Sequence, residues 1–290
     1  MREVIRSHWR EYAIEAGALG TFMISACVVT TLFEYPLSPV RQAIGDADVR
    51  RVLTGIAMGL TAIAIIYSPW GKRSGAHINP ATTLTFYRLG KVAPWDAGFY
   101  ALAHFVGATL GVLLSSLVLG KALADPAVNY VVTMPGSRGA LVAFAAELTI
   151  TMLLMIVVLL TASSARLDRY TGLFVGAMVA AFISLEGPLS GMSMNPARSF
   201  APALVAGSWA AIWVYFIAPP LGMLVGAELF LRSRRARVTP CAKMHHRNSA
   251  RCIFCEYRHQ VERGVRAPDD AYASPDARER TGTISRGAPL

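Results

Sequence analysis

Two similar stretches decide the fold of this chain: 74-SGAHINPA-81 and 190-SGMSMNPA-197. Both begin with Ser-Gly and end with Asn-Pro-Ala, and matching residues lie 116 positions apart. Asn is favoured as the N-cap of a helix and Pro as its first residue, so each Asn-Pro pair predicts a helix start. The apolar segments that follow, near 79–89 and 195–205, would form helices of only about 16 Å, roughly half the thickness of a bilayer core.

Six further segments are apolar and long enough to cross a hydrocarbon core of about 30 Å. They run near 11–33, 50–68, 96–119, 139–162, 170–187 and 208–231. The composition agrees, because 54% of the residues are hydrophobic and only 16% are charged, which is unusual for a soluble domain. The sequence therefore predicts an all-α integral membrane protein with six transmembrane helices and two re-entrant half-helices.

The chain also contains an internal duplication. Pairs of glycines spaced four residues apart, which let membrane helices approach closely, recur at almost the same interval as the two motifs. These pairs are Gly55/Gly59 with Gly172/Gly176, and Gly107/Gly111 with Gly222/Gly226. Each half, about 11–119 and about 139–232, has three spans, so the second half enters the membrane from the opposite side. Such inverted 3+3 repeats build their sites where interrupted helices meet near the midplane.

Charge predicts the orientation and the domain boundaries. Lys and Arg concentrate on the segments that are cytoplasmic if the N-terminus is inside, and only five fall in the outer loops: Arg41, Arg50, Arg51, Lys121 and Arg138. We expect a plasma (inner) membrane protein with both termini cytoplasmic: a short N-terminal segment 1–10, a membrane domain 11–232 and a basic tail 233–290. Because these flanking residues explain the net charge of +10, we expect no nucleic-acid partner.

The two Asn-Pro-Ala motifs predict a pore. The carbonyl oxygen of a capping Asn accepts a backbone N–H, which leaves its NH₂ group free to donate outwards. If Asn79 and Asn195 meet head to head, two amide donors and two positive helix ends converge at one point. A water molecule there must turn its oxygen toward the amides, so a proton cannot pass along the file, and cations are repelled. One Asn-Pro-Ala would indicate only a turn before a helix; two at the repeat spacing favour the pore.

At these motifs the chain resembles the major intrinsic protein family, which comprises the aquaporins and aquaglyceroporins, and in particular the bacterial aquaporin-type channels. The similar region covers about residues 10–232. The resemblance implies a passive channel that passes water and small neutral solutes across the lipid bilayer, excludes protons and ions, and needs no cofactor. It further implies a homotetramer with one pore in each subunit, and no enzymatic activity. Asn79-Pro80-Ala81 and Asn195-Pro196-Ala197 match its pore motifs.

The resemblance also implies a second constriction on the outer side, made by four positions. Matching from the motifs assigns them to Met58, Ile183, Met192 and Arg198, with Gly59 in place of Met58 if the loop before Ser74 carries no extra residue. Water-selective members place His and an aromatic residue in this ring, and glycerol facilitators place aromatics with a small residue. The present ring fits neither set. We expect water conduction, with a glycerol or small-solute facilitator as the alternative.

Several polar residues lie within the apolar spans. Glu147 matches a family residue that braces the half-helix loops by accepting their backbone N–H groups. Glu15 is two residues out of register with that pattern relative to Thr21, so the sequence does not assign it the same role. His104 is expected to be a hydrogen-bond partner in the packing. His77, near the cytoplasmic mouth, either lines the pore or hydrogen-bonds the loop.

Two other classes of function share this architecture. Coupled secondary transporters also use inverted repeats and broken helices, but they need titratable groups near the midplane, where the half-helix starts offer neutral Asn. A junction or scaffold protein on the same fold would tolerate a blocked pore.

The tail contains soft metal ligands at close spacing, Cys241-x3-His245-His246-x5-Cys252-x2-Cys255-x3-His259. Cys-x2-Cys is a common half of a zinc site. We expect one Zn²⁺ held by Cys241, Cys252, Cys255 and either His245 or His246 within 241–259. A disulfide between Cys252 and Cys255, or a basic tail with incidental cysteines, is the alternative. Beyond about residue 262 the composition is typical of disorder.

Overall fold

The computed structural model of the protein describes residues 2–233, 241–246 and 248–262, with the backbone alone for 258–262. Within these residues every regular element is a helix. Six helices are long and apolar enough to cross a membrane: α1 (Arg2–Glu34), α3 (Ala47–Tyr67), α6 (Pro94–Leu119), α8 (Ala140–Ala162), α9 (Thr171–Leu185) and α12 (Ile212–Arg232). The predicted all-α membrane fold is confirmed. The side chain of His259 and the tail beyond residue 262 lie outside the described residues.

The first and last spans differ from the prediction. Helix α1 begins at Arg2 rather than near residue 11, because no Gly or Pro interrupts it before Gly17. Its polar first turns are partly buried: Val4 and His8 are each only 2% exposed. Helix α12 begins at Ile212 rather than near 208, since the preceding Ala211 has a left-handed backbone with φ 53°.

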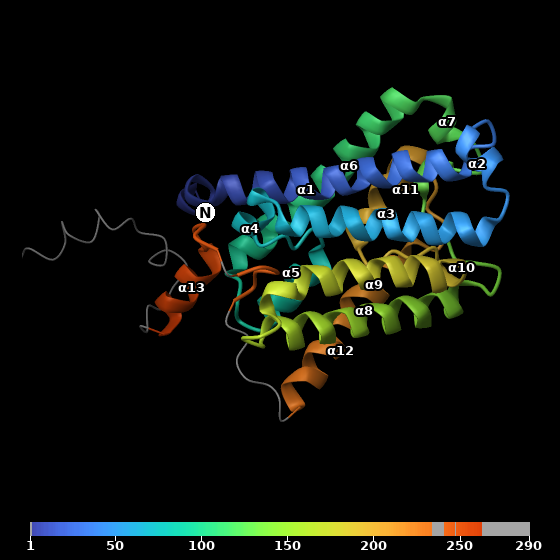
Figure 1. Ribbon diagram of the computed structural model, residues 1–290. Coiled ribbons are helices and arrows are strands. Elements are labelled where there is room, and N and C mark those ends of the chain that lie inside the picture. The colour runs from blue at the N-terminus through green and yellow to red at the C-terminus, as the bar shows by residue number, and fades with distance from the viewer. Residues whose placement is uncertain (1, 234–240, 247, 263–290) are drawn as a thin grey trace, which may run out of the picture.

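The two half-helices are α5 (Pro80–Arg88) and α11 (Pro196–Ala206), and both lie inside the bundle (Figure 1). Asn79 and Asn195 are their N-caps, and Pro80 and Pro196 their first residues. Figure 1 shows α5 toward the end that carries the N-terminus and α11 toward the opposite end, as an inverted repeat requires. We call the end with the N-terminus the inner end and the opposite one the outer end.

The shorter elements lie at the ends of the bundle. Helices α2 (Pro39–Ala43), α7 (Lys121–Ala124) and α10 (Gly187–Ser190) are at the outer end, whereas α4 (Pro69–Ser74) and α13 (Ile253–Glu262) are at the inner end (Figure 1). Two 3-10 turns, η1 (Asn129–Val131) and η2 (Asp168–Tyr170), complete the elements. At the inner end, Nη1 of Arg251 donates to the Ser7 carbonyl at 3.1 Å, so the tail contacts the first helix.

Glycines make the close helix contacts that the duplicated pairs predict. A Cβ atom on Gly59 of α3 would lie 2.5 Å from the Gly176 carbonyl oxygen of α9. One on Gly111 of α6 would lie 2.5 Å from the Gly20 carbonyl oxygen of α1. Only glycine allows these backbones to approach so closely. The contacts hold α1 against α6 and join the two repeats through α3 and α9.

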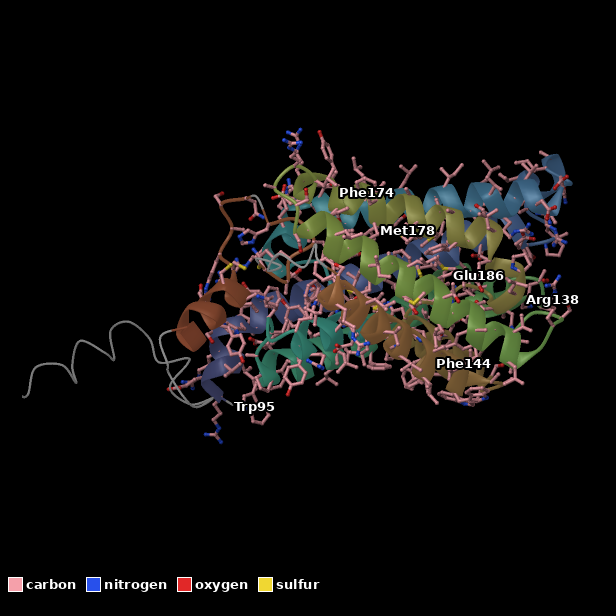
Figure 2. The ribbon with its side chains drawn as sticks, turned by 90° about the horizontal axis from the view of Figure 1, so that it is seen from below. Trp95, Arg138, Phe144, Phe174, Met178 and Glu186 are labelled. Atoms are coloured by element: carbon pink, nitrogen blue, oxygen red, sulfur yellow. The ribbon has the colours of Figure 1, made fainter. Side chains whose placement is uncertain are left out.

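The outside of the bundle is apolar, as a lipid-facing surface must be. Leu117 and Leu141 are 84% and 79% exposed. Trp95 and Phe174 also lie on this lipid-facing surface (Figure 2). The polar groups of the spans are therefore found inside the bundle, around the half-helices.

Candidate functional site

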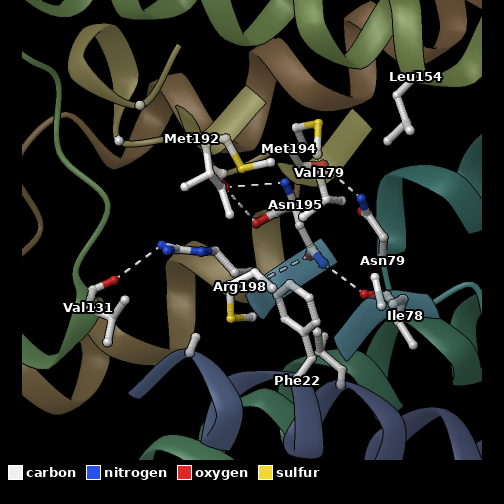
Figure 3. A pocket seen from close by; sticks show the side chains of 18 of the residues that line it. Phe22, Ile78, Asn79, Val131, Leu154, Val179, Met192, Met194, Asn195 and Arg198 are labelled. Atoms are coloured by element: carbon white, nitrogen blue, oxygen red, sulfur yellow. Dashed lines mark hydrogen bonds between the residues drawn. The ribbon is translucent and has the colours of Figure 1, made fainter. Parts of the chain in front are cut away.

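A cavity of about 560 Å³ runs along the inside of the bundle. At the outer end it is lined by Glu34 and Arg51, and at the inner end by His77 and by Met244 of the tail. Both capping residues, Asn79 and Asn195, line it between these ends (Figure 3). The cavity therefore passes the point where the two half-helices begin.

The side chains of the two Asn residues tie the half-helices together. Oδ1 of Asn79 accepts the N–H of Ala81 at 2.9 Å, and Oδ1 of Asn195 accepts that of Ala197 at 3.1 Å. In addition, Nδ2 of each Asn donates to a carbonyl of the opposite loop at 2.7 Å: Asn79 to Met194 and Asn195 to Ile78 (Figure 3). The prediction that capping leaves the NH₂ group free to donate outwards is thus wrong in part. One of its two N–H bonds is used by the other repeat.

The loops that carry these residues are held in an unusual backbone conformation. In the first loop Ala76 and Ile78 have φ of 53° and 42°, and in the second Met192 and Met194 have φ of 48° and 55°. Such left-handed values are unfavourable for residues with a side chain and persist only where surrounding contacts enforce them. Buried carboxylates supply these contacts.

Glu147 of α8 braces the second loop, as the resemblance implies. Its oxygens accept the backbone N–H of Ser193 at 2.6 Å and of Met194 at 2.7 Å, and the Ser190 hydroxyl at 2.7 Å. The side chain is fully buried. Both oxygens therefore accept hydrogen bonds from the loop that presents Asn195.

Glu15 of α1 braces the first loop in the same way, which sequence reasoning left unassigned. It accepts the N–H of His77 at 3.1 Å and of Ile78 at 2.7 Å. Nε2 of His104 donates to it at 2.8 Å, which agrees with the packing role expected for that histidine. The register argument failed because Thr21 is not the counterpart of Thr151: the Thr21 hydroxyl donates to the Gly17 carbonyl, whereas the Thr151 hydroxyl donates to the Glu147 carbonyl. The detectable signal was a carboxylate within an apolar span.

Two tyrosines add a second pair of braces that sequence reasoning missed. The Tyr100 hydroxyl donates to the Ser74 carbonyl at 2.7 Å, and the Tyr215 hydroxyl donates to the Ser190 carbonyl at 2.6 Å. The two tyrosines are 115 residues apart, the interval that separates Gly107 from Gly222. Comparison of the two repeats would therefore have found them.

All four residues assigned to the outer ring line the cavity: Met58, Ile183, Met192 and Arg198. The alternative Gly59 instead faces Gly176 of α9. Nη1 of Arg198 donates to the Val131 carbonyl at 3.1 Å and to the Thr133 hydroxyl, so the outer loop fixes the guanidinium (Figure 3). Phe22 of α1 also lines the cavity, and no sequence signal singled it out (Figure 3).

His77 lines the cavity and hydrogen-bonds within the inner end, so both of its expected roles are compatible with its position. Nε2 lies 2.8 Å from the Ala242 carbonyl oxygen, and Nδ1 lies 2.9 Å from the Thr83 hydroxyl. Because a carbonyl can only accept, Nε2 carries a proton and donates it to the Ala242 carbonyl. The tail thus contacts the loop that carries Asn79.

In the tail, the structure brings together Cys241, His246, Cys252 and Cys255, whose ligand atoms all lie within 4.8 Å of one another. The Sγ atoms of Cys241 and Cys252 are 3.3 Å apart, and His246 Nε2 is 3.9 Å from Cys255 Sγ. The neighbouring His245 packs its ring against Tyr67 instead, at 5.1 Å between centroids. Of the two histidines considered, His246 is therefore the one placed with the cysteines.

The thiols of this cluster affect one another. The Cys241 thiol donates to the sulfur of Cys252 and lowers the pKa of the Cys252 thiol, with a smaller effect from His246, while burial opposes both. The four cysteines of the chain, all in the described part, are free thiols. The same contact raises the pKa of the Cys241 thiol, so the thiolate, the form that binds metals, is favoured at Cys252 and disfavoured at Cys241.

Comparisons with known proteins agree with this geometry. The sequence pattern named Major intrinsic protein matches residues 5–230. The chain is similar to Aquaporin TIP4-4 of Zea mays, at 36% identity over 80% of this chain and 94% of that protein. It is also similar to Aquaporin NIP2-3 of Zea mays, at 34% identity over 78% of this chain and 73% of that protein.

A solved structure shows the same fold. The aquaglyceroporin from Plasmodium falciparum superimposes with a TM-score of 0.65, covering 78% of this chain and 96% of that one at 19% sequence identity. The match to the family pattern spans all six long helices and both half-helices. The chain belongs to the major intrinsic protein family.

Proposed function

We propose a water pathway through the passive channel that this chain forms. The relatives named above are aquaporins, and the chain is a channel for water and small neutral solutes rather than an enzyme. The pathway is the cavity between the half-helices. The observation that carries the proposal is the reciprocal pair of hydrogen bonds by which Asn79 and Asn195 present their amides at the same point of this cavity.

At that point the second N–H of each amide donates to the oxygen of a passing water molecule. The N-termini of α5 and α11 add positive potential from both sides. A water held in this way directs its hydrogens away from the amides, so it cannot relay a proton to the next water. The same potential opposes cations. This arrangement supports the exclusion of protons and ions.

We assign solute selection to the ring of Met58, Ile183, Met192 and Arg198. Three of its walls are apolar or flexible and one is a cation, so a solute finds few hydrogen-bond partners in addition to Arg198. Water needs little width, whereas glycerol must fit between the methionine side chains. We propose that water passes fastest and glycerol more slowly.

The hydrogen bonds of the buried carboxylates favour passive flow over coupled transport. Glu15 and Glu147 are fully buried in the middle of the bundle, where a transporter would place titratable groups. Both accept several hydrogen bonds from the half-helix loops. Protonating them would release the loops, so they are suited to bracing rather than to carrying a substrate ion.

Stopped-flow shrinkage of proteoliposomes, compared for water, glycerol and urea, tests the proposal. A passive channel conducts down any gradient of its solutes without an ion gradient. A transporter would need the ion gradient, and a scaffold protein would leave all three fluxes at the level of protein-free liposomes.

We also propose that the protein is a homotetramer in the plasma (inner) membrane with both termini cytoplasmic. The tetramer is typical of the family. The orientation is supported by the distribution of Lys and Arg and by the contact of Arg251 with Ser7, which puts the tail and the N-terminus at one end. Native mass spectrometry in mild detergent tests the assembly, and protease protection in inverted membrane vesicles tests the orientation.

Channels of this family need no cofactor for transport, but we propose that the tail binds one Zn²⁺ through Cys241, His246, Cys252 and Cys255. Three thiolates and one imidazole satisfy tetrahedral zinc. With Zn–S bonds of about 2.3 Å the ligand atoms would be about 3.8 Å apart, and the four atoms already lie within 4.8 Å of one another. Elemental analysis of protein purified without added metal tests this; much less than one zinc per chain would contradict it.

A further inference from the structure

The inner end of the cavity is covered by the tail. Met244 lines the cavity together with His77 and Ile66, and it is only 5% exposed. Its backbone N–H donates to the Gly75 carbonyl at 3.0 Å. A methionine from the tail is thereby fixed at the inner mouth against Gly75, which lies four residues before the capping residue Asn79.

Neighbouring tail residues bind the same loop. The Ala242 carbonyl accepts from Nε2 of His77 at 2.8 Å. The ring of Phe254, from the start of α13, stacks on the His77 ring with centroids 5.2 Å apart and planes at 3°. The His77 ring also stacks on that of Phe86 of α5, with centroids 5.3 Å apart. Phe254 is 2% exposed, so its ring is removed from solvent by this contact.

The loop provides space for this contact. Gly75 has φ +103°, and a Cβ atom there would lie 2.9 Å from Cε2 of Phe254 and 3.3 Å from Cγ of Lys243. Its counterpart in the second repeat, Gly191, would place a Cβ atom 3.0 Å from the Met134 carbonyl oxygen. The tail therefore occupies, at the inner end, a position that corresponds to that of the outer loop at the opposite end.

The metal ligands flank the residues that cover the mouth. Cys241 precedes and His246 follows the segment 242–245, so a bound metal closes this segment into a loop with Met244 inside it. Cys252 and Cys255 enclose Phe254 in the same way. A short segment of this kind has little core of its own, and metal binding supplies the free energy that orders it.

We propose that residues 241–246 and 248–255 form a metal-dependent plug, which closes the inner mouth of the channel when Zn²⁺ is bound and opens it when the metal is removed. The proposal rests on the channel and the zinc site proposed above. Removing the metal leaves the cysteines and His246 without the ion that joins them. Met244 is then no longer held against Gly75, nor Phe254 against His77.

The test uses the full chain in proteoliposomes, loaded with Zn²⁺ and then treated with a membrane-permeant zinc chelator that reaches both faces. We expect chelation to raise water permeability about twofold or more, which corresponds to at least half of the channels having been closed. Met244→Ala keeps all four ligands, so it should retain zinc and conduct as fast as the chelated protein. His245→Ala is the matched control: it changes the residue beside a ligand and should retain both the zinc and the response to chelation.

The possible results separate the proposals. If zinc is bound but neither chelation nor Met244→Ala changes a water permeability that exceeds that of protein-free liposomes, the channel stands and the plug is contradicted. If no zinc is bound, the metal dependence is contradicted. If wild type, chelated protein and Met244→Ala all match protein-free liposomes while size-exclusion profiles show folded protein, the channel function itself is contradicted.

Discussion

The side-chain amide of Asn79 donates a hydrogen bond of 2.7 Å to the backbone carbonyl of Met194, which joins the start of one half-helix to the loop of the other. Asn195 makes the equivalent bond to Ile78. The two repeats therefore fix each other's pore residues, and each amide keeps one N–H bond for water. Aspartate at either position would remove the donor and add negative charge where two positive helix ends meet.

The first prediction follows from this change. Asn79→Asp and Asn195→Asp should admit protons or cations, because a negative acceptor replaces a neutral donor. Proton entry measured with a trapped pH dye, in parallel with water flux, checks this. Asn129→Asp makes the same substitution in the outer loop and should leave proton entry unchanged. Unaltered proton and cation leak in both pore variants, with water flux preserved, would contradict the electrostatic account.

The second prediction concerns the brace that the sequence did not reveal. In Glu15→Gln, an NH₂ group takes the place of one carboxylate oxygen. Each of the two oxygens accepts a loop N–H, and one also accepts the N–H of His104, whereas an NH₂ group cannot accept. The fully buried site should lose about 1–3 kcal/mol of stability, and water flux should fall as the loop loosens. Thermal unfolding in detergent and stopped-flow shrinkage provide the two measurements.

The matched control for this variant is Glu228→Gln. Glu228 forms an exposed ion pair with Arg88 at 2.8 Å, and such pairs contribute only about 0–1 kcal/mol. Equal, small effects of Glu15→Gln and Glu228→Gln would show that Glu15 does not brace the first loop.

The third prediction concerns the outer ring. Met192→Ala should raise glycerol flux more than water flux, since the larger solute is the one limited by the width of the ring. Met178→Ala removes the same type of side chain from α9, at a position outside the cavity lining. It should leave both the water flux and the glycerol flux unchanged. Equal proportional increases for water and glycerol in Met192→Ala would place the selective step elsewhere.

The fourth prediction concerns pH and stability. Glu186 follows α9 at the outer end and is buried; burial, together with the nearby charge of Glu147, raises the pKa of Glu186 to about 7. A carboxyl whose pKa is higher in the folded protein than in the unfolded chain stabilises the fold at low pH, and this stability is lost as pH rises from about 4.5 to 7.

Glu186→Gln, which stays neutral, should therefore unfold about 2–5 °C above wild type at pH 8 and at nearly the same temperature at pH 5. Glu3→Gln, at an exposed position of α1, should show no such pH-dependent difference. A stabilisation by Glu186→Gln that is the same at both pH values would mean that the charge of Glu186 is not responsible.

The features that the sequence predicts correctly depend on local chemistry. Asn-Pro sets a helix start from two adjacent residues, and the glycine pairs set close contacts through their spacing along one helix. Glu15 could not be assigned because its partners, His77 and Ile78, are more than sixty residues away, whereas Glu147 is fewer than fifty residues from the loop that it braces. Nothing in the apolar pattern reveals where a carboxylate of one helix meets a loop.

The tail shows the same limit. Spacing predicts a metal site, but it cannot choose between His245 and His246, because adjacent residues differ only in the direction of their side chains. It also cannot reveal that Met244 bonds Gly75, a contact between residues that are far apart in sequence. The structure places His246 rather than His245 beside the cysteines, and Met244 against Gly75.

Water and proton flux, measured in parallel in the same zinc-depleted proteoliposomes, test most directly the claim that the protein is a passive channel whose paired Asn residues pass water and block protons. Removing the metal separates this test from the proposed plug. We predict water permeability well above that of protein-free liposomes and proton entry equal to theirs. Water permeability at the protein-free level, or proton entry that rises together with water flux, would contradict the account.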